Sequence, residues 1–221
     1  MFTVTYGLAR AACNPVVLFL ALFLPLMAIS SHSVASSRII VLGDSLTAGY
    51  GVALDGGVVP QLQRWLDAHG AADCEVINMS VSGDTTEGGR ARLEWALAEG
   101  AAAVIVELGA NDMLRGIDPA VTRGNLDAIL AALAERDLPV LLVGMRSSEN
   151  FGPEYKRAFD AIYPNLAAQY QAILDPFLLD GLVDKPALFQ DDGLHPNAAG
   201  NAVVVERLGP MVLELIARVK E

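Results

Sequence analysis

Histidine is scarce in this chain, with three among 221 residues. His32 lies near the N-terminus in a segment that we expect to be removed, which leaves His69 and His195 as candidate general bases. Only His195 has a carboxylate three residues before it, Asp192, in the run DDGLHP at 191–196. His69 ends an expected helix, where a solvated role is predicted. Because no metal-ligand spacing of a known kind is present, we expect neither a metal nor a cofactor.

Cysteine is rarer than histidine, with Cys13 and Cys74 only. If the N-terminal segment is removed, Cys74 stands alone and an internal disulfide is excluded. Cys74 falls in an apolar strand pattern, which predicts a buried and chemically inert thiol.

Positive charge is also in the minority. The chain has 15 Lys and Arg against 26 Asp and Glu, a formal net charge of −11. Loss of residues 1–35 would remove one charge, that of Arg10, and move the balance from −11 to −12. An acidic surface of this kind disfavours nucleic acid and anionic membranes as partners.

The N-terminal segment has the pattern of a secretory signal. Arg10 precedes the nearly unbroken apolar run Val16–Ile29, and small residues follow at Ser33-Val34-Ala35. The run is short for a bilayer span, which needs about 20 apolar residues. We therefore expect residues 1–35 to be a signal peptide and residues 36–221 a periplasmic domain, with no stable membrane insertion and a monomeric state. An uncleaved anchor is the alternative.

Strand-like and helix-like patterns alternate through residues 36–221, which predicts parallel strands joined by right-handed crossovers. The strand patterns are continuous apolar runs, typical of strands buried on both faces. We expect a three-layer α/β/α sandwich of the flavodoxin-like type, with five strands in the order 2-1-3-4-5. The expected strands are Arg38–Leu42, Cys74–Met79, Ala103–Leu108, Val140–Val143 and Ile173–Leu178. The expected helices include Thr85–Ala98 after an Asp84 cap, Tyr155–Tyr170 with a disturbance at Pro164, and Asn197–Val219, bent or restarted near Pro210.

Polar residues follow the expected strands at the sheet edge where such folds bind their ligands. Ser45 follows the first strand, Gly83 the second and Asn111 the third, while Asp192 and His195 precede the last helix. A hydroxyl nucleophile, a base and an orienting carboxylate make up a serine hydrolase. The Ser45 backbone N–H, the close backbone approach at Gly83 and the Asn111 amide could bind the developing oxyanion.

Neighbouring carboxylates compete for the role of the orienting acid. Asp191 is one residue further from His195 than Asp192 and is the direct competitor. Asp44 adjoins the serine, and because adjacent side chains point differently, we expect a structural hydrogen-bonding role there. Asp112, beside Asn111, is expected to fix its loop.

The motifs GDSL at 43–46, SGDT at 82–85, GAND at 109–112 and DGLHPN at 192–197 resemble, in order and spacing, those of the GDSL or SGNH hydrolase family. The chain is most similar to the secreted bacterial thioesterase, arylesterase and lysophospholipase subgroup. The resemblance implies an SGNH hydrolase fold, Ser45 as nucleophile, His195 as base, Asp192 as its partner, and a small-molecule ester as substrate. It also implies that the segment Asn111–Gly116 is a substrate-binding loop.

The candidate residues for substrate binding are mostly apolar, which suits an acyl chain or an aryl group. They are Met113, Leu114, Ile117, Met145, Phe151 and Phe177. A carbohydrate O-acetyl esterase of the same family is the main alternative. A non-catalytic flavodoxin-like binding module is more remote, because it leaves Asn111 and His195 without a function. An α/β-hydrolase is excluded because Ser45 lacks the final glycine of G-x-S-x-G.

Overall fold

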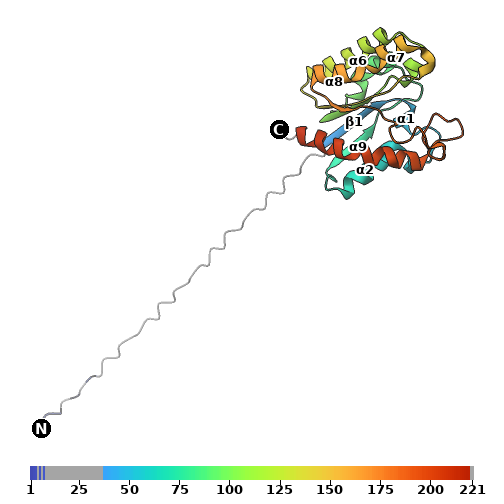
Figure 1. Ribbon diagram of the computed structural model, residues 1–221. Coiled ribbons are helices and arrows are strands. Elements are labelled where there is room, and N and C mark those ends of the chain that lie inside the picture. The colour runs from blue at the N-terminus through green and yellow to red at the C-terminus, as the bar shows by residue number, and fades with distance from the viewer. Residues whose placement is uncertain (4, 6, 8–36, 220–221) are drawn as a thin grey trace. The chain divides into compact units, whose positions relative to one another are not determined.

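A five-stranded parallel sheet forms the centre of the domain in a computed structural model that describes residues 1–3, 5, 7 and 37–219 (Figure 1). The strand order is β2-β1-β3-β4-β5, which confirms the predicted order and the α/β class. Every neighbouring pair is parallel. The strands are β1 (Ser37–Gly43), β2 (Cys74–Asn78), β3 (Ala103–Glu107), β4 (Val140–Val143) and β5 (Ile173–Asp175).

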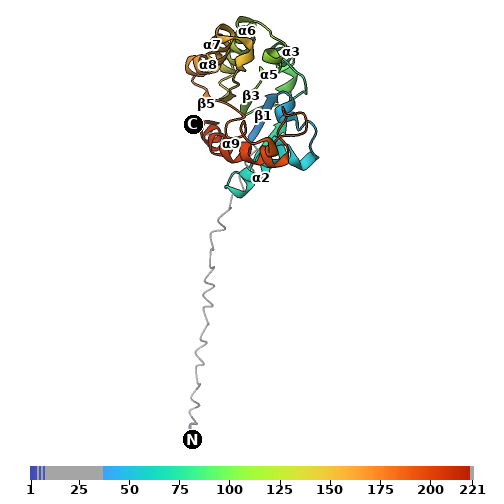
Figure 2. The same cartoon turned by 45° about the vertical axis from the view of Figure 1, so that its right-hand side comes forward.

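Helices cover both faces of this sheet, so the predicted three-layer sandwich is confirmed (Figures 1 and 2). The layer on one face contains α2 (Val58–Ala68) and α9 (Ala198–Val219), and the other contains α6 (Pro119–Ala134), α7 (Pro153–Asp160) and α8 (Ile162–Tyr170). Shorter helical elements complete the chain: α1 (Ser45–Ala48), α3 (Thr86–Ala91), α4 (Leu93–Ala96), α5 (Ala110–Leu114), η1 (Leu54–Gly56), η2 (Glu149–Phe151) and η3 (Pro186–Leu188).

The central strands are buried along their length. Ile39 to Leu42 of β1 are at most 2 % exposed, and all five residues of β3 are buried. Burial of consecutive residues means that both faces of each strand meet apolar side chains, as the unbroken hydrophobic runs predicted. Cys74 begins β2 and is itself buried. The sheet is therefore a fixed platform, and its carboxyl edge is set by where these runs end.

Two expected helices differ from the prediction. The helix expected over 85–98 is two short helices, α3 and α4, separated at Arg92, and its cap is Thr85 instead of Asp84. The helix expected over 155–170 breaks at Ala161, and Pro164 lies in the first turn of α8, where its missing N–H costs no hydrogen bond.

The remaining differences concern element ends. The strand β5 stops at Asp175, directly before Pro176, because proline cannot donate to a strand ladder. The helix α9 runs through Pro210 without a second start.

No helix among the described residues is long and apolar enough to cross a bilayer. The predicted signal peptide lies, apart from five residues at its start, outside the described residues, and its boundary at residue 35 stays a prediction.

Candidate active site

Ser45 lies at the carboxyl end of β1, as the first residue of α1. Asp44 caps this helix, and its Oδ1 accepts a hydrogen bond from the Leu46 backbone N–H at 3.0 Å. Before it comes Gly43, where a Cβ atom would lie 2.0 Å from the Thr47 hydroxyl. Only glycine fits this strand end without displacing Thr47. The GDSL motif thus forms a tight turn that presents the serine hydroxyl at the edge of the sheet.

His195 reaches Ser45 from the loop between η3 and α9. Its Nε2 lies 2.9 Å from Ser45 Oγ, and its Nδ1 lies 2.7 Å from Asp192 Oδ2. The loop bends at Gly193, which has a positive φ of 67°. Asp191 does not share this geometry, because it lines a neighbouring cavity instead. The structure therefore brings together the three side chains that the sequence singled out for a triad.

The other oxygen of Asp192 organises the loop itself. Its Oδ1 accepts the backbone N–H groups of Leu194 at 2.9 Å and of His195 at 3.0 Å. These two hydrogen bonds, that of His195 first, together with the His195 side chain, lower the pKa of Asp192 to about 2. Asp192 is consequently ionised throughout the range in which a histidine base operates, and it can hold the imidazole with Nε2 facing Ser45.

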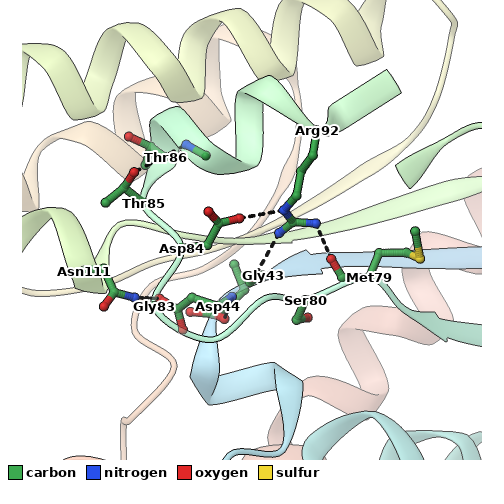
Figure 3. Close-up of polar contacts among 12 residues, drawn as sticks. Gly43, Asp44, Met79, Ser80, Gly83, Asp84, Thr85, Thr86, Arg92 and Asn111 are labelled. Carbon is green, nitrogen blue, oxygen red and sulfur yellow. Dashed lines mark hydrogen bonds and ion pairs between the residues drawn. The ribbon is translucent and has the colours of Figure 1, made fainter. Parts of the chain in front are cut away.

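The proposed oxyanion donors line the cavity that opens at Ser45 and His195. They are Ser45 itself, Gly83 and Asn111. One N–H of the Asn111 amide donates to Asp44 Oδ2 at 3.1 Å (Figure 3), which fixes the amide plane and leaves the second N–H for another acceptor. Gly83 adopts a positive φ of 84°, and its carbonyl accepts a hydrogen bond from Arg115 at 2.7 Å. By accepting this hydrogen bond from Asn111, Asp44 has the structural role that was expected of it.

Two buried acids lie beneath the serine. Glu107, at the end of β3, accepts hydrogen bonds from the Asp44 backbone N–H at 3.2 Å and from the Thr47 hydroxyl at 3.0 Å. Burial, and then the Asp44 charge, raise the pKa of Glu107 well above its usual range. Burial also raises the pKa of Asp44 to about 6, against the lowering effect of its hydrogen bonds to Leu46 and Asn111. Burial therefore favours the neutral form of both acids.

A cavity of about 420 Å³ opens from Ser45 and His195. Four of the six predicted substrate contacts line it: Met113, Leu114, Met145 and Phe177. Ile117 and Phe151 are not among the residues that line it, and their part in substrate binding stays a prediction. Both are engaged with Tyr155, whose hydroxyl donates to the Ile117 carbonyl at 2.9 Å and whose ring stacks on Phe151 with centroids 5.1 Å apart. Nearness in sequence to the loop therefore did not decide which side chains line the cavity.

Several lining residues were not singled out from the sequence. The ring of Tyr50 lies 4.6 Å from the His195 ring, centroid to centroid, and the Arg146 guanidinium lies 5.2 Å from the Phe177 centroid. Leu194 could have been found from its place beside His195, but no sequence signal marks Tyr50. The remaining lining residues are Leu46, Ser82, Ala110 and Leu179. A second cavity of about 860 Å³ adjoins the first and shares five lining residues with it: Met113, Arg146, Phe177, Leu179 and Leu194.

Sequence comparison gives the site a family. The model of the GDSL-like Lipase/Acylhydrolase family matches residues 41–203. Esterase TesA of Pseudomonas aeruginosa is 38% identical over 187 residues, 84% of this chain and 92% of that protein. An arylesterase of Vibrio mimicus is 40% identical over 179 residues, 80% and 89% respectively. Thioesterase 1/protease 1/lysophospholipase L1 of Escherichia coli K12 is 35% identical over 196 residues, 88% and 92%.

Solved structures agree with this assignment. A crystal structure of TesA is 39% identical and superimposes with a TM-score of 0.76, over 81% of this chain and 99% of that one. The psychrotrophic esterase EstA from Pseudoalteromonas sp., in a structure inhibited by monoethylphosphonate, is 30% identical with a TM-score of 0.77, over 82% and 99%. The chain therefore belongs to the GDSL-like lipase/acylhydrolase family, as an esterase with the SGNH hydrolase fold.

Proposed function

We propose that this esterase works through a covalent acyl-enzyme on Ser45. The observation that carries the proposal is the hydrogen-bonded series Ser45–His195–Asp192, with distances of 2.9 and 2.7 Å, at the mouth of an apolar cavity. Such a series activates a hydroxyl that is a weak nucleophile by itself. The name of a phosphonate-inhibited relative supports the same chemistry, because phosphonates react with activated serines.

The reaction has two halves. His195 Nε2 takes the Ser45 proton while Oγ bonds to the ester carbonyl carbon, and the imidazolium then gives that proton to the departing alcohol as the carbon–oxygen bond breaks. In the second half, a water molecule is the nucleophile and Ser45 Oγ is the leaving group. His195 takes a proton from that water, the resulting hydroxide attacks the acyl carbon, and the proton passes to Ser45 Oγ as the carboxylic acid leaves. Asp192, ionised at neutral pH, stabilises the imidazolium in both halves.

The oxyanion formed in each half needs hydrogen-bond donors. We assign the Ser45 and Gly83 backbone N–H groups and the free N–H of the Asn111 amide to this role. The first-turn N–H of Ser45 has no intrahelical acceptor, and the hydrogen bond to Asp44 turns Asn111 into a fixed donor. Removing one such donor typically costs about 10²–10³ in turnover.

The cavity favours acyl or aryl groups as the recognised part of the substrate. Met113, Leu114, Met145 and Phe177 give it apolar walls, so we propose aryl esters and short- to medium-chain acyl esters as substrates. Lysophospholipids and thioesters extend the same chemistry, in line with the names of the curated relatives. A carbohydrate O-acetyl esterase, the second candidate, calls for a polar open site, which these walls do not provide.

Fluorophosphonate labelling tests the proposed nucleophile. Mass spectrometry of the labelled protein is expected to locate the adduct on Ser45. Ser45→Ala is expected to fold normally, to escape labelling and to lose roughly 10⁵–10⁶ in turnover, as other serine hydrolases do. Ser82 also lines the cavity and provides the control, because Ser82→Ala should still be labelled at Ser45. An adduct on any other residue would contradict the proposal.

A substrate panel on one purified sample distinguishes the candidate activities. It comprises aryl esters of increasing acyl length, a lysophospholipid, an acyl-CoA and an acetylated sugar. We expect the highest kcat/KM on aryl esters with short to medium acyl chains. A preference for the acetylated sugar would favour the second candidate instead.

We further propose export to the periplasm with removal of residues 1–35. The proposal rests on the apolar run Val16–Ile29 and the small residues at 33–35. The intact mass and N-terminal sequence of the protein recovered from a periplasmic fraction test it. A protein that retains Met1 and stays with the membrane fraction would identify the segment as an anchor.

A further inference from the structure

One arginine connects three segments around the nucleophile. Arg92 lies between α3 and α4, with its side chain 15 % exposed. Its Nε donates to Asp84 Oδ2 at 2.6 Å, its Nη2 donates to the Gly43 carbonyl at 3.0 Å, and its Nη1 donates to the Met79 carbonyl (Figure 3). The helix break at Arg92, which the sequence did not predict, is the place from which the guanidinium reaches all three partners.

Two of these segments carry the proposed oxyanion donors. The Gly43 carbonyl belongs to the peptide that leads into Asp44, one residue before Ser45. Asp84 directly follows Gly83, and its backbone N–H donates to the Val81 carbonyl at 3.1 Å, which closes a turn around Gly83. The guanidinium therefore holds the chain just before one donor and just after the other.

The other hydrogen bonds between these segments beyond the end of the sheet ladder lie at residues 78–81. The Ser80 and Thr47 hydroxyls are 2.8 Å apart, and the Asn78 amide donates to the Thr47 carbonyl at 3.3 Å. The β1–β2 register ends at Val41 and Asn78. After it, the backbone hydrogen bonds between the segments are Met79 N–H to the Val41 carbonyl at 2.9 Å and Val81 N–H to the Gly43 carbonyl at 3.0 Å. Arg92 adds its bond to the same Gly43 carbonyl and extends the connection as far as Asp84.

We propose that Arg92 is a positioning residue for the oxyanion hole: its planar fork fixes the Ser45 N–H relative to the Gly83 N–H. This inference rests on the proposed function, because it presupposes that these two N–H groups stabilise the reacting oxygen. Two of the three acceptors are neutral carbonyls, so the geometry of the fork matters in addition to its charge. Lysine, a point charge on a flexible stem, cannot reproduce three fixed directions.

Substitution should therefore act on turnover more than on substrate binding. A displacement of about 1 Å in a catalytic group can cost roughly 10²-fold, which is also the scale for loss of one oxyanion donor. We expect Arg92→Ala to lower kcat about 10²-fold with little change in KM, and Arg92→Lys to give an intermediate loss. A merely structural arginine would lower the melting temperature and leave kcat per folded active site unchanged.

Chemical rescue provides the sharpest test. Steady-state kinetics of Arg92→Ala on a soluble aryl ester are measured with millimolar guanidinium chloride, far below the molar concentrations that unfold proteins, and with equal sodium chloride. Guanidinium is expected to restore kcat in a saturable manner, and sodium chloride is not. Arg136→Ala is the matched control, because Arg136 forms an exposed ion pair with Glu94 at 2.6 Å and should neither lose activity nor respond to guanidinium.

Each outcome has a defined reading. Wild-type kcat in Arg92→Ala, or a loss that guanidinium does not relieve in well-folded protein, would overturn the inference. If Arg92→Ala does not fold, Arg92→Lys decides the question, because unchanged kcat and KM there would also overturn it. Ser45→Ala is assayed in parallel: retained activity in that variant refutes the proposed function itself, whereas an inactive Ser45→Ala beside a fully active Arg92→Ala refutes only the role of Arg92.

Discussion

The floor and the rim of the active site shift the pKa values of their acidic side chains in opposite directions. The floor, formed by Asp44, Thr47 and Glu107, is at most 2 % exposed and is hydrogen-bonded to the strand ends. The rim includes Leu114, which is 52 % exposed, and Asp192, whose side chain is 37 % exposed. Burial raises the pKa of both floor acids, whereas local N–H donors lower that of Asp192 to about 2.

This difference assigns the acids to different tasks. An acid that must support an imidazolium has to be ionised, and hydrogen bonds to the charged form achieve that at an exposed position. An acid in the floor instead fixes geometry: Asp44 orients Asn111, and Glu107 supports the turn before Ser45. We therefore expect changes in the rim to alter rate and specificity, and changes in the floor to alter stability and its dependence on pH.

Among the residues of the floor and the rim, the largest effect is expected at Asp192. Asp192→Asn can still accept the two backbone N–H groups through its amide oxygen, so the loop should keep its fold. The amide nitrogen would then face His195 Nδ1 and favour the wrong imidazole tautomer. Turnover is expected to fall by about 10⁴, measured as kcat on an aryl ester, with the melting temperature nearly unchanged. Asp191→Asn is the control and should stay active; the reverse result would transfer the role to Asp191.

A smaller effect, on specificity, is expected at Leu114. Leu114→Ser should lower kcat/KM for octanoate esters more than for acetate esters, because only the longer chain reaches the apolar rim. The loss of one or two methylene contacts is worth ~1–3 kcal/mol, or about 10–100-fold. Val121, which is 51 % exposed and lies on α6, gives a matched control in Val121→Ser. Equal losses on both esters would place Leu114 outside the acyl pocket and strengthen the carbohydrate esterase alternative.

The smallest effect is expected at Glu107, in stability. A carboxyl group with a raised pKa stabilises the folded state while it is protonated, and this contribution is lost as the pH rises through the folded-state pKa. Glu107→Gln removes that titration and keeps an oxygen for Asp44 N–H and Thr47. The melting temperature of the variant relative to wild type should therefore rise by a few °C from pH 5 to pH 8, since 1 kcal/mol corresponds to about 2–4 °C in a domain of this size.

The control for Glu107 is a solvent-exposed acid. Glu135 follows α6 and is exposed. The difference in melting temperature between Glu135→Gln and wild type should therefore stay constant over the same pH range. A constant difference for Glu107→Gln as well would show that the pKa of Glu107 is the same in the folded and the unfolded protein. The distinction between floor and rim would then fail for that residue.

Periodicity in the sequence determined the frame of this protein. The apolar runs predict the five strands, since burial on both faces leaves a signal in consecutive residues. The order of the strands and the edge at which they end then bring Ser45, Gly83 and Asn111 near the loop of Asp192 and His195. The choice of Asp192 over Asp191 also followed from local spacing, because a reach of three residues across Gly193 is a property of the loop itself.

The tertiary structure decided what depends on partners distant in the sequence. Ile117 and Phe151 have the right chemistry for an acyl pocket, but contacts with Tyr155 hold them elsewhere. The bond between Asp44 N–H and Glu107 spans 63 residues, and that between Arg92 and Gly43 spans 49. Neither leaves a periodic trace in the sequence, because a hydrogen bond across loops depends on where packing places two side chains and on no local repeat. The sequence alone therefore predicted the candidate catalytic groups, and only the packed chain showed what holds them in position.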